Sequence, residues 1–576
     1  MGASTAVSLV LTCAPCYATL CSEDYFAFET RLHLVIYYGF LFLIGFFLIL
    51  RQYISAIRSF CGFHVLGALP VVGKRITLGG LVFAISVLAL VGAPTAFWLP
   101  AQDKFWGLRA DPLDWASAKL QLTITGVSGH YADILLGLLV IPVSRNSLIG
   151  HAFSLHQSTL LFAHKMLSYL FTLGALTHGV VYMLFYTDNS SEGNAAREEA
   201  FDTGNPTLTV SESEKCGSWF TLTMYTGIAA LVLVLLIVMT SVPYVRRHHY
   251  NLFYYSHVTL AVVVFIASCV HANTNFYLLI PGLLLWIVDL FRRFFRGETG
   301  GLSRKAIATV ENAGNAWIRI SLPTSKKAEA HSEKSLPSTQ PLSSYYLTIP
   351  SISKLQNHAF AAAIPSSSTS GPVFLLQRAK GKSQEALDKE WTWKLGNMVP
   401  RPMDNHSLEV KVEGPYPVND AGFRTASHIV CIVGGTGITG ASSLARWWLE
   451  TVSVANRFTL IWTVRRREMA MVREWQELEE MARPQHNMSV NIHVSSEDGR
   501  LDALQALHRA LGRDRRSNRP AGGSAWVYSS GPDSLLGATE RACVEVKKDL
   551  RASRDGRGPG AWTVEDMSWY MARWEV

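Results

Sequence analysis

Charged residues are scarce in this chain of 576 residues. Asp, Glu, Lys and Arg make up 17% of it, against about 25% in soluble proteins, whereas apolar residues make up 49%. The scarcity belongs to the first half, because the chain is a series of apolar blocks up to about residue 295 and has an ordinary soluble composition beyond it. A chain of this length forms several domains. We therefore predict a membrane half followed by a soluble half.

Two further absences exclude classes of function. The net charge of +8 comes without a basic stripe carrying interleaved aromatic residues, which argues against nucleic acid as a partner. The eight cysteines lack metal-site spacing, and the cluster of Cys13, Cys16 and Cys21 is too irregular for a zinc site. The first dozen residues lack a basic segment, which disfavours a cleaved signal peptide.

Apolar blocks approaching the roughly 20 residues that a membrane helix needs recur along the first half. We predict seven spans, at about 32–50, 78–98, 130–143, 158–186, 219–240, 253–271 and 275–291. Basic residues gather in the loops 51–75, 143–147, 245–250 and 291–297, whereas alternate loops are acidic or mixed. The positive-inside rule then places residues 1–31 outside and the soluble half in the cytosol. Glycosylation triplets begin at Asn189, in a predicted outer loop, and at Asn405 and Asn487 on the inner side.

Four histidines interrupt the apolar blocks with matched spacing. His164 and His178 are fourteen residues apart in the fourth span, and His257 and His271 are fourteen apart in the sixth. Fourteen residues are nearly four helical turns, so each pair shares one helix face over about 21 Å. Both helices run from inside to outside. His164 and His257 therefore lie near the inner face, and His178 and His271 near the outer face.

A single membrane histidine commonly makes a helix–helix hydrogen bond or serves a proton path. Identical spacing, direction and depth on two helices favour a shared ligand instead. Zinc sites need three or four ligands close together, whereas these four form two distant pairs. Two axial nitrogens per metal within apolar surroundings suit iron porphyrin. The pattern predicts two haems, held by His164 with His257 and by His178 with His271.

This repeated histidine pair, preceded by "SRNSL", resembles the fungal ferric reductases, which are relatives of the NADPH oxidases. The resemblance implies a multi-span α-helical membrane domain with a bis-haem core at 32–295. It also implies a cytosolic ferredoxin-reductase-like module, made of an antiparallel β-barrel FAD domain at 303–425 and an α/β NADPH domain at 426–576. Independently, the alternating β-branched segments after residue 303 favour a small antiparallel barrel.

The resemblance assigns flavin residues in the barrel. The family's His-Pro-Phe-Ser/Thr element corresponds to His358, Ala359, Phe360 and Ala361, so the proline and the hydroxyl are replaced. Gly414, Pro415 and Tyr416 match the family's Gly-Pro-Tyr element. Arg378 is a candidate for a flavin phosphate, or else a surface arginine at a strand end. Trp569 and Trp574 are two candidates for the aromatic residue that covers the flavin ring.

A glycine-rich turn between an apolar strand and an amphipathic helix predicts the nicotinamide nucleotide site. The turn comprises Gly434, Gly435, Thr436, Gly437, Ile438, Thr439 and Gly440. Such glycines let phosphates approach the backbone, and the helix N-terminus attracts anions. Arg465, Arg466 and Arg467 follow the next strand, where arginine suits the 2′-phosphate of NADP; the alternative is a solvated basic turn. Ser530, Gly531 and Pro532 resemble the family's Cys-Gly-Pro loop beside the nicotinamide, with serine replacing cysteine.

The resemblance implies a plasma-membrane metalloreductase that uses NADPH, FAD and two haems b to reduce extracellular ferric chelates or siderophores. Copper is a further candidate substrate, and an iron permease or oxidase system is a candidate partner. Two other functions remain open. An NADPH oxidase-like protein that reduces O₂ to superoxide would carry the same motifs. A non-catalytic haem protein with a decayed flavin site would explain the altered residues at 358–361 and Ser530.

Overall fold

The computed structural model divides into two compact units, Met1–Asp289 and Leu290–Glu575, and each is described by itself. The predicted triplet at Asn189, the cysteine cluster and Trp574 lie outside the described residues. The structure describes residues 26–576 except 55–56, 58–59, 62–63, 69–74, 108–115, 144–147, 154–156, 189–209, 297–303, 324–340, 354–355, 367–369, 379–386, 389, 417, 419–421, 452–455, 513–521, 555–561 and 573–576.

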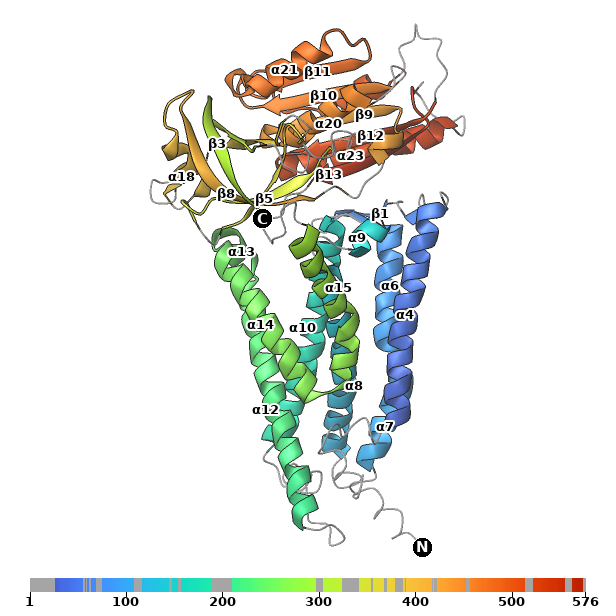
Figure 1. The fold of residues 1–576 in the computed structure, drawn as a ribbon. Helices are drawn as coiled ribbons and strands as arrows, with labels where there is room; N and C mark the ends of the chain where they lie inside the picture. Colours follow the sequence, from blue (N-terminus) through green and yellow to red (C-terminus); the bar gives the residue numbers. More distant parts are fainter. Residues whose placement is uncertain are drawn as a thin grey trace. The chain divides into compact units, whose positions relative to one another are not determined.

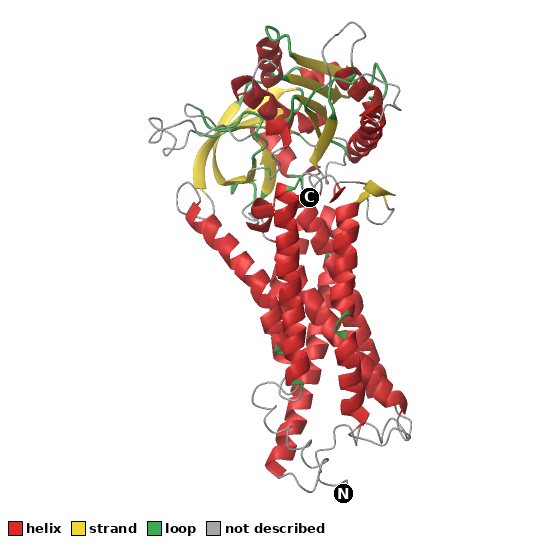
Figure 2. Cartoon of the chain, turned by 90° about the vertical axis from the view of Figure 1, so that its right-hand side faces the viewer, coloured by secondary structure: helices red, strands yellow, loops and turns green. Residues whose placement is uncertain are grey.

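The first unit is a bundle of long apolar helices that run alongside one another (Figure 1, Figure 2). A short antiparallel hairpin of β1 (His64–Ala68) and β2 (Arg75–Thr77) precedes α6. The helices are α4 (Ala27–Tyr53), α6 (Leu78–Gly92), α7 (Thr95–Gly107), α8 (Ala116–Val140), α9 (Leu148–Phe153), α10 (Gln157–Thr187), α12 (Val210–Thr240), α13 (Pro243–His248), α14 (Tyr250–His271) and α15 (Thr274–Arg296).

Seven described segments are long and apolar enough to cross a membrane, which confirms the predicted number of spans. They are Ala27–Arg51, Leu78–Lys104, Lys119–Val143, Thr159–Thr187, Leu222–Thr240, Leu252–His271 and Thr274–Phe291. The third span begins earlier than predicted because the hydroxyls of its polar residues are hydrogen-bonded within the helix. Thr125 and Ser128 donate to the carbonyls of Gln121 and Ile124, at 2.8 and 2.7 Å, so the helix continues through them.

Helix α8 lies at the centre of the bundle. Half of its apolar window is buried, against 6–33% for the other six spans. Gly137 permits this position, since a Cβ there would lie 2.7 Å from the carbonyl oxygen of Leu278 on α15. The Tyr37 hydroxyl on α4 donates to that same carbonyl at 3.0 Å. The outer helices expose apolar side chains, as helices facing lipid do.

The second unit begins with a six-stranded antiparallel sheet in the order β6-β5-β8-β3-β4-β7. Its edges meet, because the amide of Ala363 donates to the Val373 carbonyl and the Val373 amide to the Ile364 carbonyl, at 2.8 and 3.0 Å. The predicted barrel is therefore observed. Its elements are β3 (Arg304–Gly314), β4 (Trp317–Ser321), β5 (Ser344–Thr348), β6 (His358–Ala361), β7 (Val373–Gln377), α18 (Trp391–Met398) and β8 (Asn405–Tyr416).

A five-stranded parallel sheet follows, in the order β11-β10-β9-β12-β13. This is the doubly wound order that the alternating strand and helix pattern predicts. The elements are β9 (His428–Gly434), α20 (Ile438–Thr451), β10 (Arg457–Val464), η3 (Arg467–Ala470), α21 (Arg473–Ala482), β11 (Met488–Val494), α22 (Ala503–Leu511), β12 (Ser524–Ser530), α23 (Asp533–Arg554) and β13 (Asp566–Ala572).

Successive side chains of β9 point alternately into two hydrophobic cores, one on each face of the sheet. Ile429, Cys431 and Val433 pack with α20 and α21, whereas Val430 and Ile432 pack with α22 and α23. Every residue of β9 is buried, as expected for a central parallel strand covered on both faces. The first of these cores also contains barrel side chains, including Trp317 and Leu375, so the barrel packs against the face that carries α20 and α21.

The buried His428 predicts acid sensitivity of the parallel sheet. Burial, with a smaller effect of Arg457, lowers the pKa of His428 from 6.5 to about 4. The folded state therefore resists protonation that the unfolded state accepts, and stability falls as pH drops from 6.5 toward 4, by about 3 kcal/mol in total. Thermal unfolding followed by tryptophan fluorescence should show that His428→Gln reduces the slope of Tm against pH in this window. An unchanged slope would contradict the prediction.

Candidate functional site

The four membrane histidines come together as two pairs. The ring centres of His164 and His257 lie 6.1 Å apart, and those of His178 and His271 lie 5.8 Å apart. Each pair takes one ring from α10 and one from α14, as the fourteen-residue spacing predicts. Two nitrogens that share one metal atom lie about 4 Å apart, twice a metal–nitrogen bond of about 2 Å. The observed ring separations are compatible with such sharing.

Hydrogen bonds at Nδ1 orient these rings. Because a carbonyl oxygen only accepts, three of the rings carry their proton on Nδ1 and keep the Nε2 lone pair for a metal. The fourth, His257, has Nδ1 3.1 Å from the Ser241 hydroxyl. The three carbonyl contacts join His164 to Leu139 at 3.0 Å, His178 to Thr125 at 2.8 Å and His271 to Thr223 at 2.8 Å.

Small residues make room for the second pair. A Cβ at Gly227 would lie 2.7 Å from Cε1 of His271, and one at Gly129 would lie 3.1 Å from Nδ1 of His178. Among the described residues, no group of three or more His, Cys, Asp or Glu side chains could hold a metal ion. The four imidazoles occur as two facing pairs between apolar helices, a donor set that fits two bis-histidine iron porphyrins.

The predicted flavin residues lie beside α18 in the barrel. The ring centre of His358 is 5.0 Å from that of Trp391, and Phe360 stacks on the same indole at 5.7 Å. Burial lowers the pKa of His358, so its ring is neutral near pH 7. Ala359 and Ala361 pair with Tyr346 and Ser344 on β5 and bring no hydroxyl to this position.

Several buried polar atoms in this region have no hydrogen-bond partner among the described residues. Buried polar groups are normally paired, and a bound group can supply the partners of those that the protein leaves unpaired. The aromatic rings beside them are suited to cover a flavin ring, and the surroundings therefore fit a flavin. The atoms are Asn357 Oδ1, His358 Nε2, Arg378 Nε, Trp391 Nε1 and Trp393 Nε1.

The side chain of Arg378 packs against helix α18. Its guanidinium lies 3.9 Å from the centre of the Trp393 ring, and its Nη2 donates to Asn397 Oδ1. Gly396 allows this approach, because a Cβ there would lie 2.7 Å from Arg378 Cδ. The side chain is therefore ordered against α18, and its buried Nε has no hydrogen-bond partner among the described residues.

The Gly-Pro-Tyr element closes the end of β8. Gly414 has φ +122°, and its peptide bond to Pro415 is cis. The Tyr416 hydroxyl donates to Glu413, and its ring meets Tyr346 on β5 with centres 5.6 Å apart. This element thus adjoins the strand that pairs with β6.

The glycines of the nucleotide turn divide into two roles. Gly435 has φ +53° and open space where a Cβ would be, which leaves its backbone accessible to a phosphate. Gly437 and Gly440 instead permit packing, since a Cβ would lie 2.3 Å from the Ser530 carbonyl oxygen and 2.1 Å from the Tyr528 hydroxyl, respectively. Thr439 donates to the carbonyl of Thr436 at 3.1 Å and stabilises the turn into α20 at Ile438.

The turn lies where the strand order reverses. Strands β9 and β12 are neighbours whose connections leave in opposite directions, and ligands of open α/β sheets bind at the carboxyl ends of such strands. The loop of Ser530, Gly531 and Pro532 follows β12, and a Cβ at Gly531 would lie 3.0 Å from the Gly434 nitrogen. Ser530 is buried, and its side chain is hydrogen-bonded to Tyr528. The glycine-rich turn and the loop after β12, which are both predicted to bind the nucleotide, are therefore adjacent.

The predicted 2′-phosphate arginines follow β10, the neighbour of β9. Arg465 and Arg466 are exposed, and their backbone lies at the same carboxyl edge as the glycine-rich turn. Arg467 differs from them because its Nη2 pairs with Glu497 at 3.3 Å. Arg465 and Arg466 are therefore the better candidates for a phosphate.

Sequence motifs did not reveal the tryptophans that complete these sites. Trp391 and Trp393 contact the predicted flavin residues from α18, and Trp462 donates from Nε1 to the Gly435 carbonyl at 3.0 Å. The available signal was the high tryptophan content of 16 residues, which does not indicate position. Of the two aromatic candidates near the C-terminus, Trp569 lies on β13, where Lys547 Nζ is 5.6 Å from its ring centre.

Two family models match parts of this chain. Residues 128–268 match the family model "Ferric reductase like transmembrane component", and residues 426–517 match "Ferric reductase NAD binding domain". Ferric reduction oxidase 2 of Arabidopsis thaliana is 26% identical over 338 residues, which cover 58% of this chain and 40% of that protein. Ferric/cupric reductase transmembrane component 2 of Saccharomyces cerevisiae is 22% identical over 348 residues, with 58% and 42% covered. The matched region is thus about 40% of the length of these relatives.

Solved structures resemble the chain only weakly. The cytochrome b5 reductase domain of Ulva prolifera nitrate reductase has a TM-score of 0.31 at 15% identity and covers 42% of this chain and 93% of its own. The flavohemoglobin of Malassezia yamatoensis has a TM-score of 0.31 at 11% identity and covers 78% and 96%. The fold class is defined by the observed strand orders.

The fold and sites define a class of protein, namely a multi-span membrane protein with a ferredoxin-reductase-like module of an antiparallel barrel and a doubly wound α/β domain. The predicted resemblance is confirmed over two segments of the chain, since residues 128–268 and 426–517 match the transmembrane and NAD-binding family models of the ferric reductases.

Proposed function

We propose that the chain is a membrane NADPH-dependent metalloreductase whose substrate is an extracellular ferric chelate. One NADPH would supply two electrons, which reduce two Fe(III) ions to Fe(II) with release of one proton. The nicotinamide, flavin and haem groups, when bound, supply the hydride and single-electron chemistry, and the protein supplies spacing, orientation and electrostatics.

The main support for this proposal is the arrangement of the four membrane histidines as two facing pairs. His164 with His257 would hold one haem and His178 with His271 the other, and both pairs lie along the same two helices. Fourteen residues of helix place the two histidine pairs about 21 Å apart along the helix axis. Two haems at this separation would take electrons across most of the membrane thickness. The Nδ1 contacts to helix carbonyls hold the rings and favour Nε2 as the metal-binding atom.

The soluble unit supports nucleotide binding through its own residues. The amides at the start of α20 and the open backbone at Gly435 bind phosphate, and Arg465 with Arg466 binds the 2′-phosphate. His358, Phe360 and Trp391, whose rings contact one another, would hold the flavin ring, and Arg378 would bind an anionic group of the flavin. Ser530 helps to position the nicotinamide at the end of β12.

The orientation is part of the proposal. The basic loops favour an orientation with the N-terminus outside and the soluble unit in the cytosol, and the resemblance to ferric reductases implies the plasma membrane. His164 and His257 then belong to the inner haem, and His178 and His271 to the outer haem. Extracellular siderophores are a second form of the same ferric substrate.

An absorption spectrum of the purified protein before and after addition of NADPH tests the proposal. We expect haem bands in the oxidised protein and their shift to the reduced form with NADPH when FAD is present. Haem without FAD, and without reduction by NADPH, would contradict the proposal and indicate a non-catalytic haem protein.

Measurements in cells then identify the acceptor. We expect reduction of an impermeant Fe(III) chelate by intact cells that express the chain. Superoxide formation without iron reduction would overturn the metalloreductase assignment in favour of an NADPH oxidase-like activity.

A further inference from the structure

The barrel holds the segment that follows the arginine turn 465–467. Trp317, the first residue of β4, is completely buried, and its Nε1 donates to the Met469 carbonyl at 2.9 Å. Met469 lies in η3, two residues beyond the turn. A backbone carbonyl next to the predicted phosphate arginines is thus bound by a side chain of the flavin barrel.

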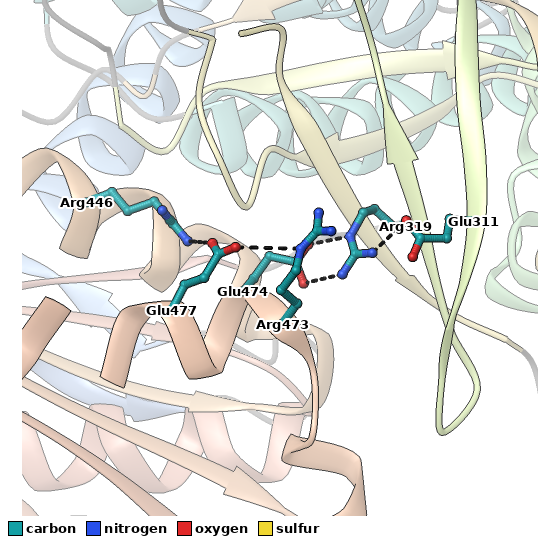
Figure 3. Close-up of polar contacts among 6 residues, drawn as sticks. All are labelled: Glu311, Arg319, Arg446, Arg473, Glu474 and Glu477. Carbon is teal, nitrogen blue, oxygen red and sulfur yellow. Dashed lines mark hydrogen bonds and ion pairs between the residues drawn. The ribbon is translucent and has the colours of Figure 1, made fainter. Parts of the chain in front are cut away.

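A buried ion pair fastens the next helix to the same strand. Arg319 on β4 donates from Nε to Glu474 Oε1 at 2.5 Å and from Nη2 to Oε2 at 3.0 Å (Figure 3). Its Nη1 lies 2.7 Å from Glu311 on β3. The Arg319 and Glu474 side chains are only 3% and 2% exposed. Burial lowers the pKa of Arg319, but the hydrogen bonds and charges of both glutamates outweigh this and raise it. The guanidinium is therefore a permanently charged connection between β4 and α21.

An aromatic cluster continues this connection to the glycine-rich turn. The ring centres of Trp317 and Trp462 are 6.3 Å apart, and those of Trp462 and Trp475 are 5.0 Å apart. Trp462 in turn holds the Gly435 carbonyl through its Nε1. The arginine turn is therefore bounded on one side by β10 with Trp462, and on the other by η3 and α21 with their barrel contacts.

We propose that Trp317 and Arg319 are positioning residues for recognition of the nucleotide 2′-phosphate. They hold the chain after the turn so that Arg465 and Arg466 meet the phosphate, which makes nucleotide selectivity a property of the barrel as well as of the α/β domain. This inference rests on the proposed use of NADPH. Other ion pairs in Figure 3, Arg446 with Glu477 at 2.8 Å and Arg473 with Glu477 at 3.5 Å, remain within the α/β domain.

Calorimetry on the purified full-length protein with its flavin tests the inference. The probes are adenosine 2′,5′-bisphosphate and adenosine 5′-monophosphate, which differ by the 2′-phosphate alone. Trp317→Phe keeps an aromatic ring but removes the Nε1 donor. We expect this variant to bind the bisphosphate about fivefold more weakly, as loss of one hydrogen bond does. Its affinity for the monophosphate should be unchanged. In steady state, the KM for NADPH should rise by the same factor with kcat unchanged.

Trp475→Phe is the matched control. It removes the same atoms from the same aromatic cluster, but Trp475 Nε1 is buried with no hydrogen-bond partner among the described residues, so no hydrogen bond is lost. We expect the affinity ratio of the two probes to stay at the wild-type value. Glu477→Gln, which affects only the pairs within the α/β domain, should also preserve it.

A second variant keeps the test informative if Trp317→Phe is poorly folded. Removing Arg319 alone would leave the buried Glu474 unpaired, whereas replacing a buried pair by apolar residues is commonly neutral for stability. We therefore expect Arg319→Met combined with Glu474→Met to fold and to lower the affinity ratio of the probes.

The two proposals fail in different ways. Equal binding of both probes by the wild type would overturn the proposed use of NADPH. If the wild type prefers the bisphosphate and loses this preference in Arg465→Ala/Arg466→Ala, while Trp317→Phe and the Arg319/Glu474 double variant keep it, the positioning role alone is wrong.

Discussion

Replacing His178 with alanine should halve the haem content of the purified protein. His178 and His271 form one ring pair and His164 and His257 the other, so loss of one axial nitrogen removes one haem and leaves the other pair intact. His271→Ala should give the same result. The haem-to-protein ratio and the reduced-minus-oxidised spectrum measure it. Reduction of the external ferric chelate should be abolished, because the remaining haem is the one assigned to the inner side.

His130→Ala is a matched control for this prediction. His130 is another histidine of the same bundle, on α8 next to Gly129, whose backbone borders the His178 ring. Its ring instead stacks on Trp98 with centres 3.6 Å apart and lies 5.6 Å from His33. The variant should keep both haems. Loss of both haems in His178→Ala, or of neither, would contradict the pairing.

Removing the two exposed arginines after β10 should change the nucleotide preference. In Arg465→Ala/Arg466→Ala the 2′-phosphate loses both charged partners, so we expect the KM for NADPH to rise by at least about tenfold. The KM for NADH, which has no 2′-phosphate, should stay near its wild-type value. Initial rates of haem reduction with each nucleotide measure both quantities.

Arg467→Ala serves as the comparison, because Arg467 is already paired with Glu497. It should alter the KM for NADPH much less than the double substitution does. Equal losses with NADPH and NADH in the double variant would indicate a structural effect on the turn instead of recognition of the phosphate.

Regular local geometry explains which parts of the fold could be predicted. A helix rises by a constant amount per residue, so a spacing of fourteen on two helices was enough to anticipate two ring pairs at two depths. The glycine-rich turn was predictable because an apolar strand and an amphipathic helix flank it within a few residues. Span 130–143 was predicted too short because hydropathy does not show that Thr125 and Ser128 satisfy their hydroxyls within the helix.

Contacts between distant segments could not be predicted in this way. Trp391 meets His358 across more than thirty residues, and Trp317 meets Met469 across 152. Neither contact has a periodic signature, since each depends on how β4, β6, α18 and α21 pack. The same holds for Gly437 and Gly440, which motif reading assigns to phosphate binding but which permit packing against β12.

The sequence by itself determined the membrane spans, the haem-type histidine spacing, the barrel and the nucleotide turn, because each depends on residues close together along one element. Only the tertiary structure decided which polar atoms converge without partners beside α18, and that strand β4 holds α21 and η3 through Arg319 and Trp317. Packing brings those residues together from separate elements, and the arrangement of an interface is a property of the folded chain rather than of any local pattern.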